Sequence, residues 1–127
     1  MAVLLEEPNL AYIDETNQAV NMVALVEKST FNVLHLFKLN KTEIGNCIHF
    51  SQHEPAQNLI FVGTTYLKLD EVVPSSGRLL LLDSKTLRLV QEIKVEGSVQ
   101  SLFFDGKCLA VAINNKVQIF AISLAKQ

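Results

Sequence analysis

Short apolar runs recur along the chain, and each one ends at a cluster of polar residues or at a glycine. The runs are rich in Val, Ile, Leu and Phe, which is typical of strands with largely buried faces. No stretch shows the period of an amphipathic helix. The pattern predicts nine strands, at residues 20–27, 33–39, 47–50, 59–63, 78–83, 88–95, 98–104, 107–113 and 116–123.

Two dipeptides between these runs are typical of tight hairpins. Asp105-Gly106 and Asn114-Asn115 contain the residues that most readily adopt positive φ, so we expect each to form a two-residue turn. Such turns join antiparallel strands, and the predicted sheet is therefore antiparallel.

The chain also repeats itself. Residues 24–39 align with residues 80–95 at an offset of 56, and both copies read as strand, polar turn and strand. A further pair of apolar runs follows each copy, from Ile48 to Gly63 and from Val99 to Ala112. Four short strands over about fifty residues are the signature of a β-propeller blade.

We therefore predict an all-β chain, a β-propeller-type fragment of two to three four-stranded antiparallel blades of the WD40-like kind. Residues 1–127 would be a single partial propeller, with a first blade-like repeat at 20–67 and a second at 77–123. Closed propellers have about four or more blades, so other blades or an oligomer would complete the ring. A closed sandwich or a small barrel of nine strands is the structural alternative.

Composition narrows the class of protein further. The chain is 49% hydrophobic and 19% charged, with a net charge of −2, which indicates a globular domain. Without a Lys/Arg run, direct contact with nucleic acid is not expected. The N-terminus lacks the basic segment of a signal peptide, and no run approaches the ~20 residues of a membrane span. We expect a nuclear and cytoplasmic protein that does not contact membranes.

The two cysteines, Cys47 and Cys108, lie inside apolar runs. Two buried, reduced thiols fit an intracellular chain better than one disulfide between them.

Acidic and histidine residues give no catalytic or metal-binding pattern. Asp70 and Glu71 are adjacent, so their side chains diverge and suit a solvated loop better than acid–base chemistry. His49 and His53 have no third ligand near them, whereas zinc needs three or four.

The remaining polar candidates also have structural interpretations. Ser75 and Ser76 have no strand–turn–helix elbow around them and read as a turn. Arg78 begins a strand and is expected to form a salt bridge or a carbonyl contact rather than to bind a partner. Thr30 and Thr86 are expected to satisfy backbone groups within the hairpin turns. We therefore predict no enzyme, no catalytic residues, no cofactor and no metal.

One set of residues resembles a known family. Val62-Gly63-Thr64 ends a strand, an acidic loop with Glu71 and Pro74 follows, and Gly77-Arg78 opens the next strand. The later positions of the pattern are Gly97, Val99, Ser101, Asp105, Gly106, Lys107, Leu109, Ala110, Ile113, Asn114 and Val117. Over residues 20–123 the chain resembles the C-terminal propeller of the large damaged-DNA-binding subunit and of the cleavage-and-polyadenylation specificity factor A subunit family.

This resemblance implies a protein-interaction scaffold. The damaged-DNA-binding subunit is an adaptor that links a cullin-RING ubiquitin ligase to substrate receptors serving DNA repair. Its relatives act in pre-mRNA splicing and 3′-end processing, which is the alternative function. The resemblance places partner-binding positions at Thr65, Tyr66, Val72, Ser98 and Gln100, although Gln100 departs from the small or aromatic residues of the family.

We therefore interpret residues 63–78, GTTYLKLDEVVPSSGR, as the connection between two strands of neighbouring blade repeats. Gly63 and Gly77 would permit sharp turns at its ends, and a partner could contact the exposed segment between them.

Two further classes of protein stay open. A propeller-like hydrolase or lectin-type domain would need polar residues around a central channel, and the sequence offers few. A self-assembling module would close its ring by homo-oligomerisation.

Overall fold

The computed structural model describes residues 2–5, 21–51 and 58–121, and these contain strands and turns but no helix. The ten strands are β1 (Ala2–Leu5), β2 (Met22–Val26), β3 (Val33–Lys38), β4 (Glu43–Phe50), β5 (Leu59–Tyr66), β6 (Gly77–Asp83), β7 (Leu89–Val95), β8 (Val99–Phe104), β9 (Cys108–Ile113) and β10 (Lys116–Ala121). Within these residues no helix is long and apolar enough to cross a membrane.

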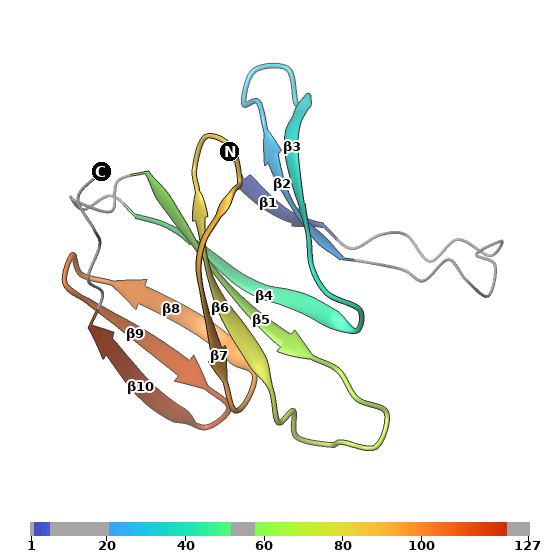
Figure 1. Cartoon of the computed structure of the whole chain (residues 1–127), viewed down its shortest axis with the longest axis vertical. Coiled ribbons are helices and arrows are strands. Elements are labelled where there is room, and N and C mark those ends of the chain that lie inside the picture. Colours follow the sequence, from blue (N-terminus) through green and yellow to red (C-terminus); the bar gives the residue numbers. More distant parts are fainter. Residues whose placement is uncertain (1, 6–20, 52–57, 122–127) are drawn as a thin grey trace, which may run out of the picture.

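The strands form three antiparallel sheets that follow one another along the chain (Figure 1). The N-terminal sheet has the order β1-β2-β3, the central sheet β4-β5-β6-β7, and the C-terminal sheet β10-β9-β8. Every pairing joins strands that are neighbours in sequence. This meander is the arrangement of a propeller blade, and it confirms the predicted all-β, propeller-type fold.

The described strands form three sheets, so they make up neither the two-sheet sandwich nor the single closed barrel considered as alternatives. The central sheet contains four strands, and each outer sheet contains three in the part of the chain that is described. The predicted repeats at 20–67 and 77–123 each run across two sheets. They describe similarity between sequence segments, and their use as domain limits stays a prediction.

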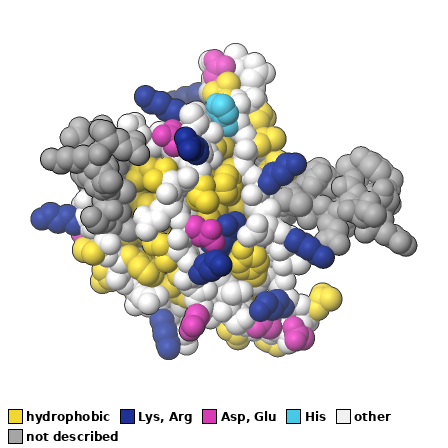
Figure 2. Space-filling view, viewed as in Figure 1, with side chains coloured by type: hydrophobic (Ala, Val, Ile, Leu, Met, Phe, Trp, Pro, Cys, Tyr) yellow, Lys and Arg dark blue, Asp and Glu magenta, His cyan; other side chains and the backbone are white. Residues whose placement is uncertain are grey.

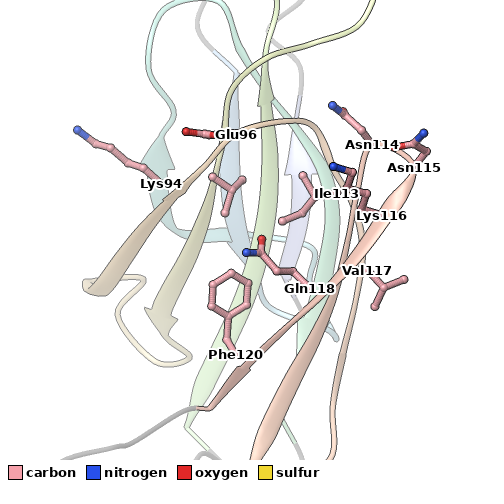
Figure 3. Close-up of a pocket in the computed structure, with 10 residues that line it drawn as sticks. Lys94, Glu96, Ile113, Asn114, Asn115, Lys116, Val117, Gln118 and Phe120 are labelled. Atoms are coloured by element: carbon pink, nitrogen blue, oxygen red, sulfur yellow. The ribbon is translucent and has the colours of Figure 1, made fainter.

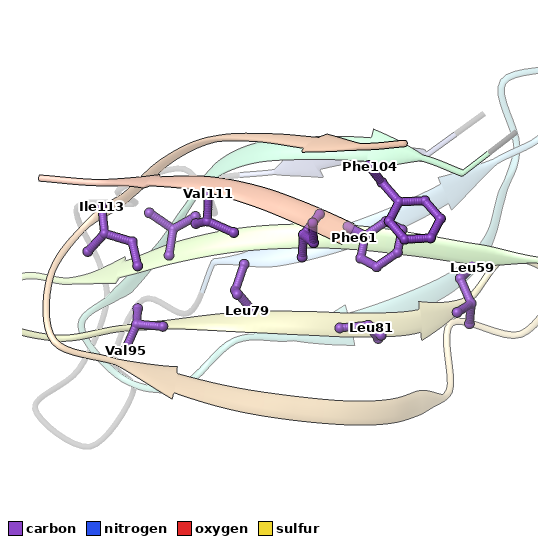
Figure 4. Packing of buried hydrophobic residues seen from close by; sticks show 10 residues of the cluster. Leu59, Phe61, Leu79, Leu81, Val95, Phe104, Val111 and Ile113 are labelled. Carbon is purple, nitrogen blue, oxygen red and sulfur yellow. The ribbon is translucent and has the colours of Figure 1, made fainter. Parts of the chain in front are cut away.

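The inner strands β5 and β6 of the central sheet are buried on both faces, because the N-terminal sheet packs on one face and the C-terminal sheet on the other. The alternation of side chains along β6 sorts them between two cores. Leu79 and Leu81 pack with Phe61 of β5 and Phe104 of β8 (Figure 4), whereas Leu80 and Leu82 belong to a second cluster with residues of the N-terminal sheet. Leu residues occur at consecutive positions in β6 because each face of this strand packs against another sheet.

The sequence repeat is a repeat of backbone geometry. The β2–β3 and β6–β7 hairpins have register shifts at equivalent places, between Leu25 and Val26 and between Leu81 and Leu82. In the turns, Thr30 Oγ1 accepts a hydrogen bond from the Asn32 backbone N–H, as Thr86 Oγ1 does from Arg88, each at 3.3 Å. The predicted role of both threonines is thus confirmed.

The two hairpin turns differ in what covers them. Phe31 and Leu87 occupy equivalent positions with φ of 60° and 57°. Leu87 is buried against the N-terminal sheet, but Phe31 is 70% exposed. The turn conformation is therefore encoded locally, since it is the same with and without a neighbouring sheet.

The other two predicted turns are only partly as expected. Asn114 and Asn115 form the two-residue turn between β9 and β10, and Asn114 has φ of 53°. In the β8–β9 turn the Asp105 backbone N–H bonds to the Cys108 carbonyl, so Gly106 and Lys107 occupy the central positions. The Asp105 side chain supports that turn by accepting bonds from the Lys107 and Cys108 N–H groups.

The prediction that Gly63 and Gly77 permit sharp turns is wrong. Both lie within strands, and the glycines with positive φ are Gly97 and Gly106 among the described residues. A Cβ at Gly63 would lie 2.3 Å from Val99 Cγ1 and 2.7 Å from Cys47 Sγ. Gly63 is therefore required because the C-terminal sheet approaches the central sheet closely at this point.

Replacing Gly63 by alanine is expected to destabilise the protein by about 1–3 kcal/mol, because the added methyl group overpacks the contact with Val99. Urea unfolding would measure the loss. The double variant Gly63→Ala/Val99→Ala is the control, since removing the valine methyls makes room for the new one. Its stability should exceed the value expected if the two single changes were additive; simple additivity would contradict the proposed clash.

Candidate functional site

The candidate site is the segment between β5 and β6, residues 67–76, which we call the connector. It leaves the sheet after Tyr66 and returns at Gly77, at the same end of the molecule as the β9–β10 turn (Figure 1). At its start the Leu67 N–H bonds to the Thr42 carbonyl at 2.8 Å, and across its base the Tyr66 N–H bonds to the Ser76 carbonyl at 3.0 Å. The base of the connector is therefore fixed by backbone hydrogen bonds.

The middle of the connector exposes apolar side chains. Leu69 and Val72 are fully exposed, and Val73 is 64% exposed. Asp70 is exposed as predicted, but Glu71 is half-buried, and its Oε1 is buried without a hydrogen-bond partner among the described residues. Exposed apolar side chains held on an anchored loop are typical of a protein-binding surface.

A polar network joins the central sheet to the C-terminal sheet beside the connector. Thr65 Oγ1 and Ser98 Oγ lie 2.5 Å apart and share a hydrogen bond. Asn46 Nδ2 donates to both hydroxyls and, at 3.0 Å, to the Val99 carbonyl oxygen. Thr65 and Ser98 are both buried, so their hydroxyl groups contribute to the contact between sheets.

The structure brings together some of the predicted partner-binding residues and separates others. Thr65 and Ser98 touch through the network just described, and Gln100 is exposed two residues further along. Tyr66 is half-buried, and its hydroxyl accepts a hydrogen bond from Asn40 Nδ2 at 2.6 Å. Val72 lies on the connector, outside this hydrogen-bond network. That these five residues contact a partner stays a prediction.

A buried ion pair lies inside the central sheet. Arg78 Nε donates to Glu43 Oε2 at 2.7 Å, and Arg78 Nη2 donates to Oε1 at 2.5 Å. Thr64 Oγ1 also donates to Glu43 Oε2 at 2.5 Å. The pair links β4, β5 and β6, and it confirms the prediction that Arg78 forms a salt bridge.

The charge of Arg78 is maintained by its partners. Burial by itself would lower the pKa of its guanidinium, but the hydrogen bonds and the negative charge of Glu43 outweigh that effect and raise the pKa above its usual value. Glu92 of β7 adds a weaker contact, 3.6 Å from Arg78 Nη1. A buried charge with two hydrogen-bonded carboxylate oxygens is a structural element rather than a reactive group.

The cysteines are free thiols, but both are half-buried rather than buried. Burial raises the pKa of Cys47 from 9.0 to about 11, and a hydrogen bond with the Gly63 backbone opposes this only in part. The Cys47 thiol is therefore protonated at neutral pH.

The described residues assemble no metal site, since no three His, Cys, Asp or Glu side chains among them cluster. His49 contacts the rings of Phe61 and Phe103, and His53 lies outside the described residues. The surface in Figure 2 mixes hydrophobic side chains with charges of both signs.

A groove of about 640 Å³ lies between β7 and β10, lined by residues that include Lys94, Glu96, Lys116, Gln118 and Phe120 (Figure 3). The lining residues provide two lysines, a carboxylate, amides and apolar side chains, but no nucleophile beside a base. The groove therefore lies between two sheets, and its lining is of mixed polar and apolar character.

Sequence reasoning missed Glu43, Asn46 and Asn114 as determinants of this end of the molecule. Glu43 and Asn46 precede the apolar run predicted to begin at residue 47. Their partners on other strands, Thr65, Arg78 and Val99, are 19 to 53 residues away. For Asn114 the sequence predicts a turn and a position of the family pattern, but no contact of its side chain. Nothing in the neighbouring sequence predicts that the Asn114 side chain bonds to Pro74.

Taken together, three meandering antiparallel sheets, an anchored apolar connector and buried polar groups that join strands and sheets define a propeller-type chain. Residues 20–126 match the family described as the CPSF A subunit region, and the chain belongs to this family.

Its relatives include DNA damage-binding protein 1 of Oryza sativa subsp. japonica, which is 34% identical over 116 residues covering 88% of this chain. DNA damage-binding protein 1 of Solanum lycopersicum is 32% identical, and protein 1a of Arabidopsis thaliana is 33% identical, each over 80% of the chain. The chain spans about 10% of the length of these relatives.

Replacing Glu43 by glutamine is expected to destabilise the protein by about 3–5 kcal/mol, because Arg78 would remain buried without its counter-charge. Denaturant unfolding measures the difference. Glu92→Gln is the matched control, since it removes the longer and more exposed contact with the same arginine and should cost less than about 1 kcal/mol. Equal effects of the two changes would contradict the importance of the buried pair.

Cys47 in a Cys108→Ser variant is expected to react slowly with iodoacetamide at pH 8, because the raised pKa leaves about a hundredfold less thiolate than a pKa of 9.0 would. The rate should rise with pH up to about 11. Folding raises the pKa of Cys47, so the folded protein holds the thiol proton more tightly than the unfolded chain does. The resulting contribution to the free energy of unfolding is complete below pH 9 and is lost as the pH rises from 9 to 11. The same variant in urea is the control, and equal rates in both states would be inconsistent with this environment.

Proposed function

We propose that the chain forms part of a non-enzymatic protein-interaction scaffold, an adaptor of the kind that links a cullin-RING ubiquitin ligase to substrate receptors in DNA repair. Membership of the family and the similarity to three proteins named for DNA damage binding support this proposal. A role beside damaged DNA implies a nuclear location. The absence of a basic run in the sequence favours protein rather than nucleic acid as the direct partner.

The observation that carries the proposal is the connector. Leu69, Val72 and Val73 offer apolar side chains to solvent, while hydrogen bonds at Tyr66 and Leu67 fix the base of the loop. An apolar group already held in position loses little conformational entropy when it binds, so it contributes strongly to an interface.

Within this proposal the five predicted positions have different roles. Val72 and Gln100 are exposed and would touch the partner directly, and Tyr66 would border the contact. Thr65 and Ser98 are buried and bonded to each other, so they would shape the surface from beneath.

A second candidate is a propeller subunit of pre-mRNA splicing or 3′-end processing. The family description, a region of the CPSF A subunit, favours it specifically. The two candidates predict different partners for the same surface, and this difference makes them separable by experiment.

Affinity purification of the tagged chain from nuclear extract, with quantitative mass spectrometry, tests the proposal. We expect a cullin and ligase substrate receptors. Recovery of splicing or polyadenylation subunits instead would support the second candidate and overturn the first. Light scattering of the purified chain would show a ring-sized oligomer if the chain acted as a self-assembling module.

Replacing Val72 by aspartate is expected to lower the recovery of the receptors at least about tenfold, because the change removes an apolar contact and places a charge in the interface. Leu34→Asp is the matched control, since Leu34 is also exposed but lies on β3 of the N-terminal sheet. Equal recovery with Val72→Asp and the unaltered chain would exclude the connector as the contact surface.

A further inference from the structure

Asn114 joins three segments that are distant in the sequence. Its backbone N–H donates to the Ser98 carbonyl at 2.9 Å, and its side-chain Oδ1 accepts from the Ser98 N–H at 2.8 Å. Its Nδ2 donates to the carbonyl oxygen of Pro74 in the connector at 3.1 Å. The residue therefore bonds the connector to the segment that precedes β8.

The chemistry at this position suits asparagine. The φ of 53° at Asn114 is in the left-handed region, which asparagine and aspartate tolerate better than other residues with a side chain. The side chain must accept a hydrogen bond at one atom and donate at the other. An amide does both, whereas a carboxylate only accepts.

Two glycines leave room for this arrangement. A Cβ at Gly97 would lie 2.8 Å from Asn114 Nδ2, and Gly97 has φ of 157°, which side-chain-bearing residues rarely adopt. A Cβ at Gly77, where the connector ends, would lie 2.5 Å from the Gly97 carbonyl oxygen. The end of the connector, Gly97 and the Asn114 side chain are thus packed closely together.

The position of this contact along the connector is informative. Backbone hydrogen bonds fix the connector at Tyr66 and Leu67, and Pro74 cannot contribute an N–H of its own. Val72 and Val73 directly precede Pro74, so the bond from Asn114 holds the part of the loop that carries exposed apolar side chains.

We propose that Asn114 is a positioning residue: its amide holds the connector against the C-terminal sheet and fixes Val72 and Val73 where an apolar surface of a partner protein can contact them. The contact with a partner rests on the proposed function, whereas the restraint of the connector does not. Val72 and the Ser98–Gln100 segment then act as one surface, although they belong to different sheets.

The test is limited trypsin digestion of the whole chain, with cleavage after Lys68 in the connector as the readout and cleavage after Lys85 in the β6–β7 turn as the internal reference. Asn114→Asp keeps the side-chain size, the turn conformation and the acceptor for Ser98, but it loses the donor to Pro74. We expect cleavage after Lys68 to become about three- to tenfold faster, with cleavage after Lys85 unchanged. Asn115→Asp adds the same charge at the neighbouring position and should leave both rates unchanged.

An unchanged rate after Lys68 in Asn114→Asp would overturn the proposal. An equal acceleration after Lys68 and Lys85, with a lower urea midpoint, would overturn it as well, because Asn114 would then support the whole fold rather than the connector.

The purification described for Val72→Asp separates this inference from the proposed function. If receptor recovery falls in both Val72→Asp and Asn114→Asp, positioning for the partner is supported. If it falls only in Val72→Asp while Asn114→Asp loosens the connector, positioning for the partner is overturned and the proposed function stands. If receptor recovery is unchanged in Val72→Asp, the connector is excluded as the contact surface and positioning for the partner is overturned with it. The proposed function is then decided by which partners are recovered, and the trypsin rates decide whether Asn114 restrains the connector.

Discussion

The fold depends on the burial of the central sheet between two others. Strands β5 and β6 have no solvent-facing side, so each of their residues must be apolar, very small, or paired with another buried polar group. Three features meet this requirement. The leucines of β6 are apolar, Gly63 is small enough to fit beneath Val99, and the charge of Arg78 is paired with Glu43. The outer strands β3 and β7 are free of it and carry exposed side chains.

The same constraint explains why the candidate site is at one end of the sheet. In the middle of the sheets, apolar side chains meet directly, and any polar group would lose its water without compensation. At the end, where β5 leads into the connector, Asn46 and Thr65 bond to Ser98 across the boundary between sheets. Asn114 bonds to Ser98 and, through its side chain, to Pro74 of the connector. Hydrogen bonds of this kind specify a unique arrangement, because each donor must meet its own acceptor.

Much of the fold could be predicted from the sequence, because strands and hairpins depend on neighbours along the chain. The short apolar runs located nine of the ten strands, and the Thr30 and Thr86 turns followed from local chemistry. β1 was missed, because its four residues form too short a run to be distinguished without the pairing to β2. The resemblance to a known family could also be found in the sequence, because Gly63, Pro74 and Arg78 occur at spacings characteristic of that family.

The site was less predictable, because its residues meet only after the sheets have packed. The local sequence favours a turn at Gly63, yet its small size matters for contact with Val99, 36 residues further along the chain. The ion pair of Arg78 was foreseen without its partner, since pairing with Glu43 depends on the register of three strands. Such contacts join residues from distant segments, so no short segment of the sequence predicts them.

The meander order also has a consequence for how the chain folds. All strand pairs join sequence neighbours, so each hairpin closes a short loop and can form early at a small cost in entropy. The bonds from Asn46 to Val99 and from Asn114 to Pro74 close loops of 53 and 40 residues, and they can form only after two sheets have met. Docking of whole sheets is therefore expected to be the slow step of folding.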